Sequence, residues 1–204
     1  MDINGVFKFT TFLLVLLNPF LVIVYLVDVM DVLSFKKFRN VLLRAGFISL
    51  LAFWLFALMG DIIFKTFIKA EFASFQIFGG VVFLIIGIQF VFKGKSAIEG
   101  LRGESQHIAG AIAMPILIGP GTLSYCVIVG KKLDPIPAMV AVFIAVFSCI
   151  AIMVLFKKVY DTIHAKKEDL LQRYFEIAGR VTAIIIGTIS IDMIMQGIKY
   201  WINK

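Results

Sequence analysis

Two short stretches place proline beside asparagine or glycine inside long apolar runs, and each could expose backbone polar groups to a ligand. They are Asn18-Pro19, in the first run, and Gly119-Pro120-Gly121, in the fourth. Proline removes a backbone donor and crowds the preceding helical turn, so each stretch predicts a broken helix. Inside a bilayer, a break is tolerated only where it faces protein or a water-filled cavity. The sequence therefore predicts a polar site at membrane depth.

The groups at these breaks suit an anionic or zwitterionic ligand. The N–H groups of Gly121 and Thr122 begin a half-helix after Pro120, and the positive end of a helix favours a carboxylate. The side chains of Asn18, Thr122 and Ser124 either contact the ligand or have local roles. In the local alternative, the amide bonds to a neighbouring helix and the hydroxyls bond back to the preceding turn.

Asp192 lies two to three turns from the end of the last apolar run. A carboxylate at the bilayer centre costs roughly 2.5–3.5 kcal/mol, so an aspartate there is a functional candidate, and its protonation suits a proton-coupled step. Alternatively, Asp192 is shallow and hydrated or pairs with Lys199. The apolar runs hold no paired carboxylates, nucleophile–histidine set or metal-spaced cluster, so we expect no enzyme, no metal and no cofactor.

Composition indicates a polytopic membrane protein. Of the 204 residues, 61% are apolar and 16% are charged, whereas soluble domains have about 25% charged residues. The net charge of +7 is explained by basic loops at the inner leaflet, without a nucleic-acid partner. Cys126 and Cys149 fall within apolar runs and are expected to be buried hydrophobes.

Six transmembrane helices are predicted in one membrane domain. The loops on one side carry thirteen Lys and Arg residues and those on the other carry seven, which places both termini outside by the positive-inside rule. The spans cover approximately residues 6–27, 41–64, 73–92, 108–129, 138–156 and 177–198.

The two halves of the chain look duplicated. Residues 75–87 and 175–187 are identical at seven of thirteen positions without a gap, and Pro19 and Pro120 share this offset within one residue. We therefore divide the chain into repeat one, a connector and repeat two. Three spans per repeat force the second repeat to enter from the opposite side, which makes the repeats inverted, with helices 1 and 4 broken. Many secondary transporters are built in this way, with substrate at the repeat interface. The three parts are residues 1–92, 93–107 and 108–204.

The chain resembles the MarC/SnatA family (UPF0056), the six-span neutral amino acid transporter family, over nearly its whole length. The motifs that carry the resemblance are Leu17-Asn18-Pro19, the segment 75–80, Pro115 with Gly119-Pro120-Gly121, and Gln196-Gly197-Ile198.

The resemblance implies a multi-pass protein of a prokaryotic inner membrane with inverted three-span repeats. For members studied as transporters, it implies uptake of glycine, alanine or other small neutral amino acids, coupled to protons or another ion such as sodium. We expect alternating access, with Asp192 carrying the coupling proton. The alternative is a non-transporting inner-membrane protein with a scaffolding or stress-response role. The substrate-binding residues implied by position are Asn18, Pro19, Gly119, Pro120, Gly121 and Thr122.

Overall fold

The computed structural model describes residues 3–93 and 117–202, and every regular element in these two ranges is a helix. The prediction of an all-helical protein is confirmed for this part of the chain. Most of the predicted connector 93–107, and the beginning of the fourth predicted span, lie outside the described residues. In chain order the elements are α1 (Ile3–Leu17), α2 (Pro19–Val32), α3 (Phe35–Ile62), the π-helix η1 (Ile63–Ile68), α4 (Phe72–Lys93), α7 (Pro120–Lys132) and α8 (Pro135–Ile202).

Four described stretches are long and apolar enough to cross a membrane. They are Phe35–Gly60 in α3, Phe72–Gln89 in α4, and Pro135–Thr162 and Ile177–Ile202 in α8. We call the last two the first arm and the second arm of α8. The first predicted span is divided into α1 and α2, and α1 alone, with 15 residues, is shorter than the ~20 residues that a span needs. These helices fit a multi-pass membrane protein.

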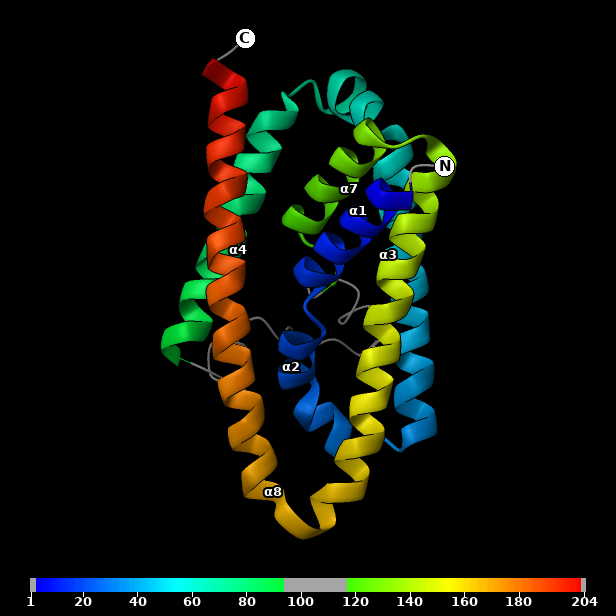
Figure 1. Ribbon diagram of the computed structural model, residues 1–204, viewed down its shortest axis with the longest axis vertical. Helices are drawn as coiled ribbons and strands as arrows, with labels where there is room; N and C mark the ends of the chain where they lie inside the picture. The colour runs from blue at the N-terminus through cyan, green and yellow to red at the C-terminus, as the bar shows by residue number, and fades with distance from the viewer. Residues whose placement is uncertain (1–2, 94–116, 203–204) are drawn as a thin grey trace.

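Helix α8 turns back on itself, so that its two arms form the tall outer frame of the molecule (Figure 1). The first arm packs beside α3 and the second arm beside α4. Helices α1, α2 and α7 lie between these two sides in the view of Figure 1, and both chain ends lie at the top. The short, interrupted helices are therefore held inside a frame of longer ones.

Glycines allow the long helices of this frame to approach closely. A Cβ atom added at Gly87 in α4 would lie 3.1 Å from the Ala183 carbonyl oxygen and 3.4 Å from the Gly187 nitrogen. One added at Gly46 in α3 would lie 2.9 Å from Ile150 Cγ1. Small residues are how membrane helices come close enough for dense packing, so Gly87 and Gly46 are packing sites between the long helices.

The outward faces of the long helices are apolar. Phe47 is 62% exposed, Phe147 is 61% exposed and Ile184 is 60% exposed. Leaving such side chains in water forgoes about 1.5–3 kcal/mol of burial free energy each. Hydrocarbon around these helices removes that penalty.

The stretch between the first two predicted spans is mostly helical. Helix α2 continues to Val32, and α3 already begins at Phe35. Hydropathy detects only the apolar part of a span, whereas the helix continues past it. The exposed side chains of Lys36 and Lys37 occupy this added first turn of α3.

Candidate functional site

The break between α1 and α2 is centred on Asn18. Its φ of 42° lies in the left-handed region, which asparagine tolerates better than most residues and which commonly ends helices. The Asn18 N–H donates to the Leu14 carbonyl at 3.1 Å, and the Asn18 carbonyl accepts from Val22 N–H at 3.1 Å. Asn18 therefore closes one helix and opens the next, while Pro19 takes the first helical position, where a missing N–H costs nothing.

The break before α7 has a different construction. Gly119 is extended, with φ −110° and ψ 163°, and Pro120 is the first helical residue. The Thr122 hydroxyl accepts from Gly119 N–H at 2.9 Å and lies 2.9 Å from the carbonyl oxygens of both Leu117 and Gly119, to either of which it can donate. The hydroxyl of Thr122 thus bonds back to the preceding turn and fixes the shape of the break.

Ser124 behaves differently from Thr122. Its Oγ is fully buried in α7 and makes no hydrogen bond with any residue that the structure describes. A buried hydroxyl is normally hydrogen-bonded, because leaving it unsatisfied costs about 1–3 kcal/mol. Of the two hydroxyls considered from the sequence, Ser124 is therefore the one left with capacity for a further partner.

Helix α4 covers the start of α7 at close range. A Cβ atom added at Gly79 would lie 2.9 Å from the Pro120 carbonyl carbon and 3.0 Å from the Gly121 nitrogen. The ring of Phe83, one turn along α4, lies against Gly121. The sequence placed Gly79 in the motif at residues 75–80 but did not indicate its partner, and it gave no sign of Phe83. The residue types at the break are small because α4 passes directly over it.

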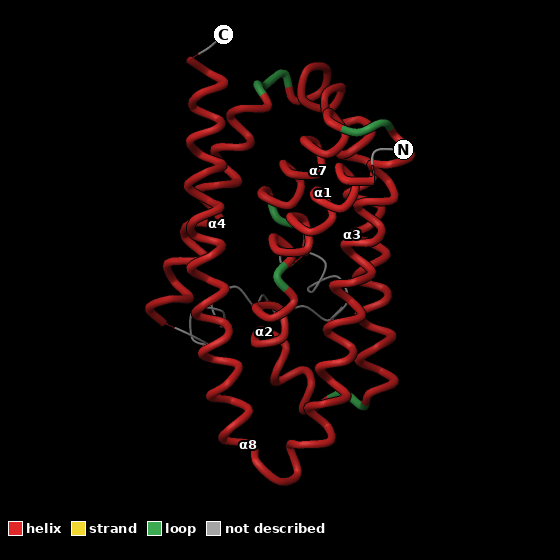
Figure 2. Tube along the Cα trace, viewed as in Figure 1, coloured by secondary structure: helices red, strands yellow, loops and turns green. Residues whose placement is uncertain are grey.

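Both breaks lie near mid-height of the molecule, where Figure 2 shows one short non-helical segment between α1 and α2 and another at the start of α7. Both are buried: Asn18 is 4% exposed and Thr122 is 2% exposed. Helices α1 and α7 pack against each other, and the rings of Phe12 and Tyr125 stack between them with centroids 4.7 Å apart. The two interrupted helices are thus neighbours in the interior.

Asp192 is exposed on the second arm of α8. Its carboxylate accepts from Gln196 Nε2 at 2.7 Å, and Gln196 Oε1 accepts from Gln76 Nε2 of α4 at 3.3 Å. At 1.5 Å per residue, Asp192 lies about 15 Å from the end of α8 at Ile202, which is near the middle of that arm. The hydrogen-bond partner of Asp192 is thus Gln196 rather than Lys199. Among the described residues, the structure does not bring Asp192 together with either break.

One protein-family model and several related proteins each match nearly the whole chain. A family model described as MarC family integral membrane protein matches residues 3–202. A UPF0056 membrane protein of Aquifex aeolicus is 25% identical over 92% of this chain and 89% of its own length. One from Methanocaldococcus jannaschii is 27% identical over 90% and 91%, respectively. The names of these relatives state a membrane protein and give no substrate, and no solved structure shows a significant match.

Proposed function

Because the chain belongs to the MarC family of integral membrane proteins, we propose that it is a secondary transporter of small neutral amino acids such as glycine or alanine. The observation that carries the proposal is the pair of buried breaks at mid-height, each followed by a helix that starts with proline. Interrupted helices near the midplane are how many secondary transporters build their substrate sites. The relatives' names leave the substrate open, so its identity rests on the family resemblance.

We propose that the two halves are inverted repeats of three spans each, making six spans in a single membrane domain. The first arm of α8 begins at Pro135, 100 residues after α3 begins at Phe35. The same offset relates Gly87 to Gly187, which lie opposite each other in the structure. A residue on a two-fold axis meets its own equivalent, so this contact supports an axis passing between α4 and the second arm.

A second contact supports the same axis on the other side of the molecule. Gly46 in α3 packs against Ile150, and a Cβ atom added at Gly46 would also lie 3.7 Å from Val146 Cγ1, its equivalent at the 100-residue offset. Helix α3 thus crosses the first arm of α8, and α4 crosses the second arm, near positions that correspond to each other at the 100-residue offset. Alternating access follows from such an arrangement when one repeat rocks against the other around a fixed site.

In the proposed site, substrate binds between the two breaks, at Asn18, Pro19, Gly119, Pro120, Gly121 and Thr122. The N-terminal ends of α2 and α7 supply partial positive charge for the substrate carboxylate, and the Asn18 side chain supplies a polar contact. Thr122 acts by holding the backbone of the break, while Phe83 and α4, which cover Gly121 closely, limit the room for a large side chain. This geometry favours a small amino acid.

Asp192 is proposed as the residue that binds the coupling proton or sodium ion. Its position near the middle of an apolar arm makes an ionised carboxylate costly there, and proton or cation binding relieves that cost.

We further propose that the protein lies in a prokaryotic inner membrane with both termini outside. The lysines at the start of α3 and around Lys158 lie at the opposite end of the molecule from the termini, and basic residues favour the inner side of the membrane.

Ligand-dependent stabilisation tests the proposal. A ligand that binds only the folded state raises the apparent Tm, so glycine or alanine should raise the Tm of the detergent-solubilised protein, and arginine should not. Absence of any rise at millimolar glycine and alanine would contradict the assigned substrates. That result would favour a non-transporting role, for which a stable complex with another membrane protein is the expected sign.

A further inference from the structure

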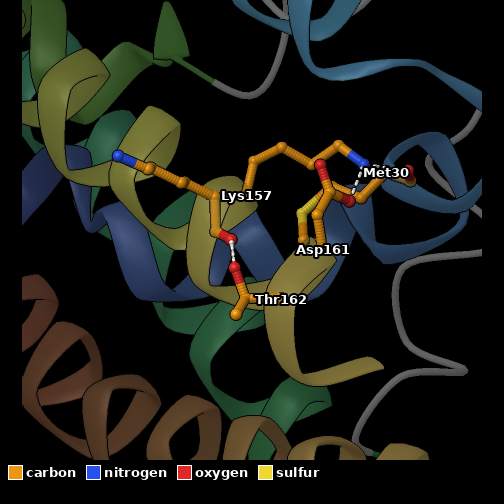
Figure 3. A network of polar contacts seen from close by, with 5 residues as sticks. Met30, Lys157, Asp161 and Thr162 are labelled. Carbon is orange, nitrogen blue, oxygen red and sulfur yellow. Dashed lines mark hydrogen bonds and ion pairs between the residues drawn. The ribbon is translucent and has the colours of Figure 1, made fainter. Parts of the chain in front are cut away.

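Lys157 is a buried cation in the first arm of α8. Its side chain is 3% exposed, although Lys157 directly follows the predicted span 138–156. Because the first arm remains helical past this position, the side chain points into the bundle. Its Nζ donates to the Met30 carbonyl oxygen at 2.6 Å and to Asp161 Oδ1 at 2.5 Å (Figure 3).

The Met30 carbonyl belongs to the last turn of the half-helix α2, which ends at Val32. The last carbonyls of a helix lack intrahelical partners and carry the negative end of the helix dipole. Here the Val29 carbonyl is satisfied by Leu33 N–H at 3.0 Å, and the Met30 carbonyl is satisfied by the ammonium group of Lys157. Lys157 therefore ties the end of α2 to α8.

Asp161 makes this tie reversible. An isolated buried ammonium group is costly, so the carboxylate one turn further along α8 neutralises it. The Asp161 side chain is 41% exposed, so water reaches the outer side of the pair. Water and Asp161 together can hold the ammonium group when it leaves the Met30 carbonyl, which lowers the barrier to breaking the tie.

The contact at the equivalent positions, 100 residues away in the sequence, involves no charged side chain. Gly130 of α7 lies 100 residues after Met30, and Ala57 of α3 lies 100 residues before Lys157. A Cβ atom added at Gly130 would overlap the Ala57 carbonyl oxygen. The same pair of positions thus meets in both halves, by direct backbone packing between α7 and α3 but through a lysine side chain between α2 and α8.

We propose that Lys157 is a latch that holds the end of α2 against the first arm of α8 and releases it when α2 moves during transport. A hydrogen bond made through a long side chain can break and reform as α2 moves, whereas the direct packing of Gly130 on Ala57 keeps α7 fixed on α3. The movement of α2 rests on the proposed function, whereas the tie itself does not.

Hydrogen–deuterium exchange of the detergent-solubilised protein tests the tie. In Lys157→Met, the amides at the end of α2 should exchange at least about tenfold faster than in the wild type, because a charge-assisted bond to that turn is lost. Lys158→Met, at an exposed neighbouring lysine, is the matched control and should not change exchange in α2. Unchanged exchange in folded Lys157→Met overturns the latch.

Asp161→Asn keeps the Lys157–Met30 bond but removes the neutralising charge, and it decides the matter if Lys157→Met does not fold. Because Asp161 lowers the barrier to breaking the tie, slower α2 exchange than in the Lys158→Met control supports the latch, and exchange that is unchanged or faster overturns it.

Transport separates this inference from the proposed function. Where wild-type protein takes up glycine, folded Lys157→Met should keep the glycine-induced Tm rise while its turnover changes at least about threefold. Unchanged turnover overturns the latch, whereas wild-type protein without binding or uptake overturns the proposed function alone.

Discussion

Gly121, at the start of α7, lies directly against the ring of Phe83 in α4, so closely that a methyl group on Gly121 would overlap the ring. The break in the chain before α7 is therefore also a packing contact with a long helix. Any side chain at position 121 would push α7 away from α4 and change the shape of the proposed site.

Gly121→Ala should destabilise the protein. Forcing an extra methyl group into a packed interior typically costs about 1–3 kcal/mol, so thermal unfolding in detergent should show a clearly lower apparent Tm. Gly187→Ala is the matched control, because a Cβ atom there meets nothing within 4 Å and alanine favours the helix. Equal Tm values for the two variants would show that the Phe83 contact is not tight.

Two substitutions at Asn18 separate the role of its backbone from that of its amide. Asn18→Gly keeps the left-handed conformation, whereas Asn18→Ala places a Cβ where left-handed backbone costs about 1–2 kcal/mol. We expect Asn18→Gly to unfold at a higher temperature than Asn18→Ala, and we expect both to lose the Tm rise produced by glycine. A full ligand-induced rise in Asn18→Gly would mean that the amide does not contact substrate.

Thr122→Val should weaken the break before α7. It removes the hydroxyl that accepts from Gly119 N–H, and the loss of such a cap typically costs about 0.5–2 kcal/mol. Thr122→Ser retains the hydroxyl and should remain closer to wild type in thermal unfolding. If Val and Ser variants unfold at the same temperature, the hydroxyl does not stabilise the break.

Asp192→Asn should uncouple transport from its ion. The variant keeps the size of the side chain and can still bond to Gln196, but it cannot take up a proton and has no negative charge to hold a cation. Exchange of labelled glycine for unlabelled glycine across the membrane should continue, while uptake driven by a proton or sodium gradient should fall at least about tenfold. Asp134→Asn, at an exposed residue between α7 and α8, is the control. Gradient-driven uptake at the wild-type rate in Asp192→Asn would remove Asp192 from the coupling mechanism.

Features set by local chemistry were predictable from the sequence. Asn18-Pro19 separates α1 from α2, and α7 begins at Pro120, both at the expected positions, because proline and left-handed asparagine act on the adjacent turn. Membrane character followed from composition, and membership of the family was confirmed by the match to residues 3–202.

Features set by tertiary neighbours were not predictable. The burial of Lys157 was not foreseen, because hydropathy cannot tell that the carbonyl of Met30, 127 residues away, provides it with a buried acceptor. The contact of Phe83 with Gly121 was missed for the same reason, since one phenylalanine among 21 carries no local signal. The limits of α3 were also misjudged, because its first turn is charged and apolar periodicity begins later.

Uptake of labelled glycine and alanine into proteoliposomes is the most direct measurement of the central claim. Wild-type protein should accumulate one or both amino acids above protein-free liposomes under an inward proton or sodium gradient, and Asn18→Gly should not. Accumulation no greater than in protein-free liposomes, for both amino acids and under both gradients, would contradict the claim that this protein transports small neutral amino acids.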